Sequence, residues 1–114
     1  MNVINCSTTE DFVKFIQEKD VAIVLLSKRP CGFCEKVEPI FTELSRECEY
    51  PCLKMVIYTT SPAEVKKIPF DFGMRMAPAL AIFRNGKLLN YTIEFIDQKQ
   101  MMGFVIATLK LLTN

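Results

Sequence analysis

An unbroken apolar run that leads into two cysteines is the feature that most constrains the fold of this chain. Residues 21–27 are almost entirely apolar, which is typical of a central parallel strand buried on both faces. Cys31-Gly32-Phe33-Cys34 follows, and a helical pattern covers residues 34–48. The sequence therefore predicts a buried strand, a pair of cysteines and a long helix in direct succession.

The place of the two cysteines favours thiol chemistry. The first turn of a helix leaves backbone N–H groups without intrahelical partners, and the helix macrodipole adds partial positive charge there. A thiol at that position is shifted toward the thiolate, which is the nucleophilic form. Cys34 follows Cys31 by one helical turn, close enough for a disulfide after small adjustments. The pattern indicates a redox site.

The length of the chain predicts a single domain, and its net charge argues against several classes of partner. A chain of 114 residues can build a single core, so we expect one domain spanning residues 1–114. The net charge of +1, from 14 basic and 13 acidic residues, gives no electrostatic case for nucleic acid or an anionic membrane. We expect a monomer that needs no cofactor.

The sequence contains no pattern for export or for spanning a membrane. Its longest apolar run is about six residues, whereas roughly 20 are needed to cross a bilayer. The N-terminal region contains Glu10 and Asp11 and lacks the apolar stretch of a signal peptide. The odd number of cysteines, five, also differs from a secreted disulfide scaffold. We therefore expect a cytoplasmic protein.

Strands and helices alternate along the chain. The expected strands cover residues 1–6, 21–27, 53–58, 79–84 and 87–95. The expected helices cover residues 7–19, residues 34–48, a short stretch between Ser61 and Pro69, and residues 97–112. This order predicts an α/β fold with a central mixed sheet, in which parallel strands are followed by a C-terminal antiparallel hairpin and helices lie on both faces.

Local signals mark where these elements begin and turn. Ser7 and Glu10 form a capping-box pattern, with Ser7 as the N-cap. Asn85-Gly86 is the strongest short signal for a hairpin, and Asp97 is expected to cap the last helix. Pro39 falls inside the long helix and is expected to kink it.

Two segments carry a resemblance to a known family. Residues 31–40 contain the cysteine pair and, at the family's offset from Cys34, the helix proline Pro39. Residues 72–87 resemble the segment that runs through a cis-proline, here Pro78, into the terminal hairpin. On these motifs, and on the order of its elements, the chain resembles the thioredoxin family and is expected to have the thioredoxin fold.

The resemblance implies roles for individual residues. Cys31 would attack a substrate disulfide as the nucleophile, and Cys34 would resolve the resulting mixed disulfide. Pro78, as the cis-proline, would leave the backbone of Ala77 free to pair with an extended substrate peptide. An apolar rim would be formed by Pro30, Phe33, Met76 and Ala77. The resemblance implies a thiol–disulfide oxidoreductase that reduces protein disulfides and is itself reduced by a partner reductase or a dithiol.

The chain departs from the family's pattern beside the cysteines. Pro30 stands where thioredoxins have tryptophan, and Phe33 stands where they have proline. Leu25 replaces a buried aspartate that is thought to relay a proton from the second cysteine, so we expect Cys34 to deprotonate less readily. Three basic side chains, Lys28, Arg29 and Arg75, either favour the Cys31 thiolate or form a solvated rim.

Alternatives remain for the function and for the other cysteines. The chain could instead be a thioredoxin-fold binding or assembly module with little redox turnover. A disulfide isomerase or oxidase is a further reading, disfavoured because no secretion signal or histidine between the cysteines is present. Cys48 and Cys52 either complete a zinc site with the first pair, form a second disulfide or pack as small apolar residues. A single helix would hold Cys34 and Cys48 about 20 Å apart, which argues against zinc, and Cys6 is expected to pack.

Overall fold

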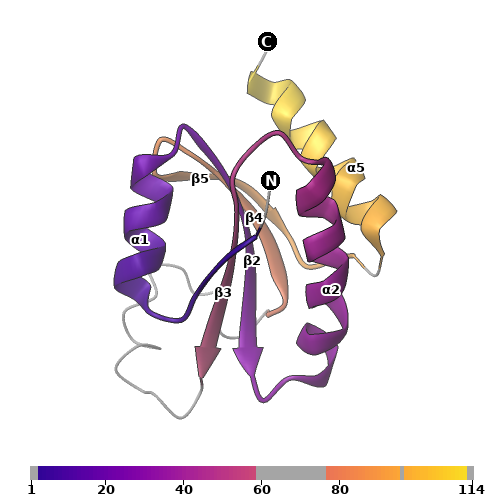
Figure 1. Ribbon diagram of the computed structural model, residues 1–114. Helices are drawn as coiled ribbons and strands as arrows, with labels where there is room; N and C mark the ends of the chain where they lie inside the picture. Colours follow the sequence, from indigo (N-terminus) through magenta and orange to yellow (C-terminus); the bar gives the residue numbers. More distant parts are fainter. Residues whose placement is uncertain (1–2, 59–76, 96, 113–114) are drawn as a thin grey trace.

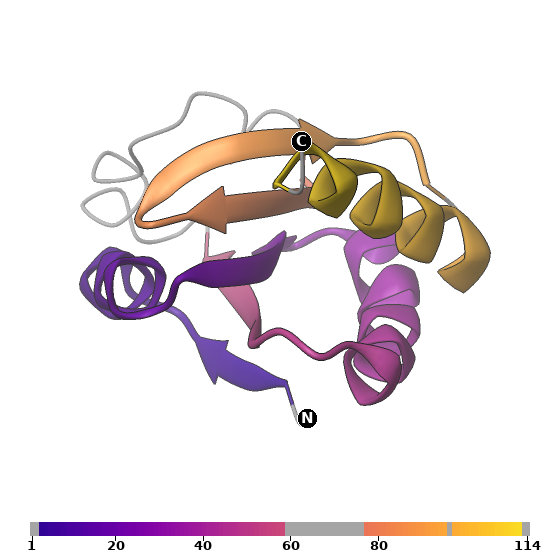
Figure 2. The ribbon, with the colours of Figure 1, turned by 90° about the horizontal axis from the view of Figure 1, so that it is seen from above.

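The computed structural model describes residues 3–58, 77–95 and 97–112. They form three layers, with one sheet between two layers of helices (Figure 1). The strands are β1 (Ile4–Cys6), β2 (Val21–Arg29), β3 (Cys52–Tyr58), β4 (Ala79–Arg84) and β5 (Lys87–Thr92), and their order in the sheet is β1-β3-β2-β4-β5. Helix α1 (Thr9–Glu18) covers one face. Helices α2 (Gly32–Glu47) and α5 (Gln98–Leu109) cover the other, and the short 3-10 helix η1 (Lys110–Leu112) follows α5 (Figure 2).

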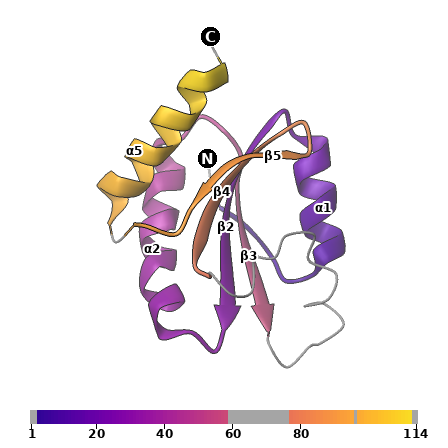
Figure 3. The same cartoon turned by 180° about the vertical axis from the view of Figure 1, so that it is seen from behind.

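The sheet is mixed, as the sequence predicts. β1 and β2 both run parallel to β3, whereas β4 runs antiparallel to β2 and to β5. The hairpin of β4 and β5 lies beside β2, and α2 and α5 lie next to one another on the same face (Figure 3). The expected α/β architecture is therefore confirmed. The helix expected before Pro69 and the connection at residues 70–76 lie outside the described residues.

Strand β2 divides the interior into two apolar clusters because its side chains alternate between the two faces. Every residue from Val21 to Ser27 is buried. On the α1 face, Phe12 packs edge-on against Phe83, with ring centroids 5.6 Å apart. On the opposite face the cluster is built mainly from β2, β4, α2 and α5; among its largest members are Phe41, Phe95, Met101, Ile23, Leu25, Leu44, Leu80 and Ile82. The central strand is thus fixed from both sides.

Several element boundaries differ from the prediction. Helix α1 begins one residue later, because Thr8 and not Ser7 is the N-cap and its Oγ1 accepts a hydrogen bond from the Asp11 N–H. Glu10 is therefore not in the capping-box position. β2 continues to Arg29 because its last residues still pair with β3, where Arg29 lies opposite Tyr58.

The second half of the chain also differs in detail. Helix α2 begins at Gly32, two residues before the predicted start, and continues through Pro39. β5 ends at Thr92, which lies opposite Leu80 near the start of β4, so the chain beyond it has no strand to pair with. Ile106, in α5, is exposed. Among the described residues, no helix combines the length and apolar character needed to cross a membrane.

The hairpin between β4 and β5 has the predicted turn. Asn85 and Gly86 both have positive φ, 52° and 81°, as a type I′ turn requires. A Cβ atom on Gly86 would lie 3.4 Å from Cγ of Gln17 in α1, which is ordinary van der Waals contact. The constraint on this glycine therefore comes from its backbone conformation.

Gly86→Ala is expected to lower the free energy of unfolding by about 1 kcal/mol, because a residue with a Cβ is strained in the left-handed region. Gly103, inside α5, offers the matched control, since a Cβ there meets nothing within 4 Å. Gly103→Ala is expected to raise the free energy of unfolding by roughly 0.5–1 kcal/mol. Urea denaturation curves measure both, and shifts of the same sign would contradict the assignment.

Candidate active site

Cys31 is the N-cap residue of α2, directly after the central strand. Its sulfur accepts a hydrogen bond from the Cys34 N–H at 3.1 Å, and its carbonyl accepts one from the Glu35 N–H at 3.3 Å. A sulfur at this place faces the free N–H groups and the positive end of the helix macrodipole. The environment therefore favours negative charge on Cys31.

Cys31 and Cys34 are joined as a disulfide, with their Cα atoms 5.3 Å apart. The two cysteines differ in access to solvent. Cys34 is fully buried at 0 % exposure on the inner face of α2, whereas Cys31 is partly exposed at the helix start. Another molecule can therefore reach the Cys31 sulfur first.

The other residues predicted for the site occupy different environments. Phe33 is 45 % exposed, so it is not part of the core, and Pro30 is also exposed. Pro78 is buried and Ala77 is partly exposed just before β4, whose first residue pairs with Leu26 near the end of β2. This register brings Ala77 and Pro78 to the end of the sheet from which the cysteine pair projects (Figure 1). Met76 lies outside the described residues.

Two peptide bonds at this end of the sheet are cis. One joins Ala77 to Pro78, and the other joins Arg29 to Pro30, immediately before the cysteine pair. Only the first of these was expected from the sequence.

A buried carboxylate stands beside the cysteine pair, on the turn of α2 that follows Cys34. Glu38 accepts two hydrogen bonds from the Arg29 guanidinium, each 2.7 Å, and one from the Ser27 hydroxyl, also 2.7 Å. The ammonium group of Lys54 in β3 completes the cluster at 3.2 Å. We call Ser27, Arg29, Glu38 and Lys54 the charge cluster; it joins α2 to the end of β2 and to β3.

The charge cluster alters the interpretation of the basic residues. Burial alone would raise the pKa of the Glu38 carboxyl, but hydrogen bonds from Arg29, Ser27 and Lys54 outweigh it and lower the pKa to about 2. Glu38 is therefore ionised throughout the physiological range. Arg29, which the sequence offered as a cation for Cys31, is instead bound in a bidentate pair with Glu38. Arg75, offered for the same role, lies outside the described residues.

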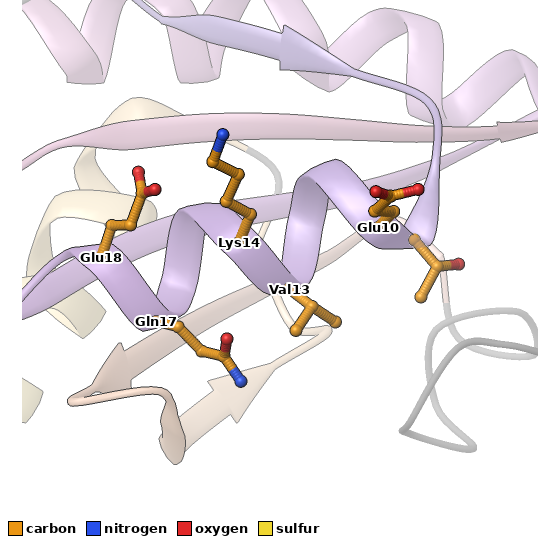
Figure 4. Close-up of a pocket in the computed structure, with 6 residues that line it drawn as sticks. Glu10, Val13, Lys14, Gln17 and Glu18 are labelled. Atoms are coloured by element: carbon orange, nitrogen blue, oxygen red, sulfur yellow. The ribbon is translucent and has the colours of Figure 1, made fainter.

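A surface hollow adjoins the exposed cysteine. It is lined by Arg29, Pro30, Cys31, Gly32, Glu35 and Tyr58. Another hollow lies along α1, where Val13, Lys14 and Gln17 are among the side chains that line it (Figure 4). All of its lining residues come from one helix, and none is a cysteine. Of these two hollows, the one beside Cys31 is lined by a cysteine and can serve thiol chemistry.

The remaining cysteines are free thiols. Cys6 is partly buried against the apolar cluster on the α1 face, as expected, and its thiol donates to Sδ of Met55 at 3.2 Å. Burial raises the pKa of Cys6 to about 11. Cys48 and Cys52 lie at the end of α2 opposite Cys31. Within the described part of the chain, no three His, Cys, Asp or Glu side chains form a group that could hold a metal, so a zinc site shared by both pairs is not supported.

Comparison with known proteins gives a consistent result. The family model described as Thioredoxin matches residues 3–107. A thioredoxin of Rickettsia typhi is 24 % identical over 90 % of this chain and 96 % of its own length, and one of Haemophilus influenzae is 26 % identical over 83 % and 87 %. A solved structure of a mutant thioredoxin from Halobacterium salinarum has a TM-score of 0.73 at 16 % identity, covering 94 % of this chain and 90 % of that one. This last likeness concerns the fold.

The charge cluster predicts a specific acid sensitivity. Because the pKa of Glu38 is lowered from 4.5 to about 2, its contribution to stability is present above pH 4.5 and is lost as the pH falls toward 2. That contribution is at most about 3 kcal/mol. Glu38→Gln is expected to destabilise the protein by about that amount at pH 7 and to flatten the loss of stability between pH 4.5 and 2.

Urea unfolding at a series of pH values measures this effect. Glu43, on the same helix, is the matched control, since its pair with Arg46 is exposed on both sides. Glu43→Gln is expected to change stability by less than about 1 kcal/mol. Equal effects of the two substitutions would refute a special role for Glu38.

Proposed function

This chain belongs to the thioredoxin family of thiol–disulfide oxidoreductases, and we propose that it reduces disulfides in other proteins. The observation that carries the proposal is the difference between its two cysteines. One sulfur caps the helix and is open to solvent, and the other is buried one turn further along. This is the arrangement required for one attacking and one resolving thiol.

In the proposed reaction the reduced protein acts in two steps. The Cys31 thiolate attacks one sulfur of a substrate disulfide, and the other substrate sulfur leaves as a thiolate. Cys34 then loses its proton and attacks the Cys31 sulfur, which releases the second substrate sulfur and forms the Cys31–Cys34 disulfide. The substrate gains two electrons, and a partner reductase or a small dithiol returns the protein to its reduced form.

We propose that the substrate peptide binds across the end of the sheet beside Cys31. Exposed Pro30 and Phe33, together with Met76, would form the apolar rim. The partly exposed backbone of Ala77, next to Pro78, would pair with an extended segment of the substrate. The hollow lined in part by Tyr58 would accept side chains that flank the substrate cysteine.

The second candidate is a binding or assembly module that forms contacts through the same surface but turns over slowly. The replacement of the family's buried aspartate by Leu25, which is fully buried, supports this candidate. For either function we propose a single domain working as a monomer in a reducing compartment such as the cytoplasm. There Cys6, Cys48 and Cys52 would remain thiols.

Insulin reduction with dithiothreitol as electron donor tests the first candidate. The wild-type protein is expected to accelerate precipitation of the insulin chains, and Cys31→Ser is expected to abolish the acceleration. Cys34→Ser is expected to retain the first step and to accumulate a covalent adduct with a disulfide substrate. The adduct should be visible by non-reducing electrophoresis and absent from Cys31→Ser. A wild-type rate equal to that of Cys31→Ser would favour the binding module.

Leu25→Asp is expected to accelerate the resolving step, because it places an acid in the apolar cluster that contains the face of α2 with Cys34. Leu25 lies opposite Lys54 in the register of β2 and β3, so the new carboxylate would lie next to the charge cluster. Stopped-flow release of substrate thiol from the mixed disulfide measures the step. Leu25→Asn is the control, since it introduces a similar buried polar group without an ionisable proton. An equal rate in both variants would count against proton transfer.

A further inference from the structure

A second pair of cysteines lies at the C-terminal end of α2. Cys48 is the C-cap residue of the helix, and Cys52 is the first residue of β3. Both belong to the apolar cluster that contains Leu44, with exposures of 8 % and 1 %. Neither takes part in a disulfide. Two buried thiols thus flank one short turn.

The turn holds both sulfurs against one residue. The Tyr50 N–H donates to Sγ of Cys48 at 3.5 Å, and the Cys52 thiol donates to the Tyr50 carbonyl at 3.4 Å. Both sulfurs therefore contact the backbone of Tyr50, in the middle of the turn that joins α2 to β3. The turn is anchored to the central strand, because the Pro51 carbonyl accepts from the Ile23 N–H at 2.9 Å.

These contacts make the two thiols chemically unequal. The neighbouring Cys52 side chain and the hydrogen bond from the Tyr50 N–H lower the pKa of Cys48 to about 6, against burial and nearby Glu49. The neighbouring Cys48 side chain, together with burial, raises the pKa of Cys52. The arrangement is a thiolate beside a protonated thiol, which is the pairing that disulfide formation uses.

We propose that Cys48 and Cys52 are a second redox-active pair, which closes to an intramolecular disulfide when the protein meets a peroxide. Simple packing would require only two small apolar side chains in the cluster. It does not account for a turn in which both sulfurs form hydrogen bonds with the backbone of the same residue, Tyr50.

The proposed oxidation takes place in two balanced steps. The Cys48 thiolate attacks one oxygen of hydrogen peroxide, forming a Cys48 sulfenic acid and releasing hydroxide, which is protonated to water. The Cys52 sulfur then displaces the sulfenic hydroxyl, the Cys52 proton leaves with it as water, and the S–S bond forms. The two sulfurs lose two electrons, and the peroxide gains them.

The second pair acts independently of the first within one molecule. The rise of the helix places Cys34 and Cys48 about 20 Å apart, too far for direct exchange between the two pairs. The oxidant must also be small, because Cys48 and Cys52 are almost fully buried. A peroxide meets this requirement, whereas a folded protein disulfide does not.

Peptide mapping after exposure to limiting hydrogen peroxide tests the proposal. Trypsin releases Cys48 and Cys52 together in residues 47–54, whereas the first pair lies in residues 29–36 and Cys6 lies in residues 1–14. The wild-type protein, pre-oxidised at the first pair, is mixed with peroxide at neutral pH, and free thiols are then blocked before digestion. Residues 47–54 are expected to lose two hydrogen atoms in mass and to lose both blockable thiols. Dithiothreitol should restore them.

Further controls test whether the oxidation is specific to Cys48 and Cys52. Cys6, with its raised pKa and no thiol partner, is expected to react at least about ten times more slowly than Cys48. Cys31→Ser/Cys34→Ser is expected to leave oxidation of residues 47–54 unchanged, and adding Cys48→Ser should leave Cys52 reduced. The proposal is overturned if residues 47–54 keep both thiols while Cys6 oxidises, or if they gain oxygen without ever losing the two hydrogens. Neither outcome depends on the first pair or on insulin reduction.

Discussion

The carboxylate of Glu38 fixes the geometry on which the site depends. It lies on α2 and binds Arg29 at the end of β2, Ser27 in the same strand and Lys54 in β3. These contacts hold the first turns of α2 against the strand that leads into Cys31. Replacing a buried ion pair by apolar residues often costs little stability, but removing one partner costs several kcal/mol. The charge cluster is therefore best understood as a device that positions the start of the helix.

The sequence predicted the parts of the fold that depend on neighbours in the chain. Three features have a local sequence pattern and are present in the structure: the apolar strand β2, the closely spaced cysteine pair and the hairpin turn at Asn85-Gly86. Glu38 was missed, because glutamate is rarely buried and its partners meet it only after α2 packs on the sheet. A signal was nonetheless present, since Glu38 falls between Val37 and Phe41 on the buried face of the helix.

The predicted ends of helices and strands were wrong where two adjacent residues were equally suitable by local criteria. Ser7 and Thr8 are both good N-cap residues. The choice between them is made by β1, which pairs Cys6 with Met55 and so sets where the chain leaves the sheet. The end of β2 was predicted too early for a similar reason. Arg29 is charged, which is not typical of a buried strand, but its ion pair with Glu38 allows it to remain in the strand. These boundaries depend on tertiary contacts, which a short stretch of sequence does not contain.

The two ends of α2 offer sulfur opposite electrostatic environments. At Cys31 the free N–H groups and the macrodipole both favour a thiolate. At Cys48 the macrodipole has the opposite sign, so a thiolate there depends on the neighbouring Cys52 side chain and on the hydrogen bond from the Tyr50 amide. Between them, the only acid in the charge cluster has a pKa of about 2 and cannot accept a proton from Cys34 at neutral pH. With Leu25 in place of an acid, the proposed first exchange step would be favoured and the second would be slowed. A fast attack followed by slow resolution would hold a substrate covalently. The two proposed functions, reductase and binding module, would then differ only in the rate at which Cys34 loses its proton.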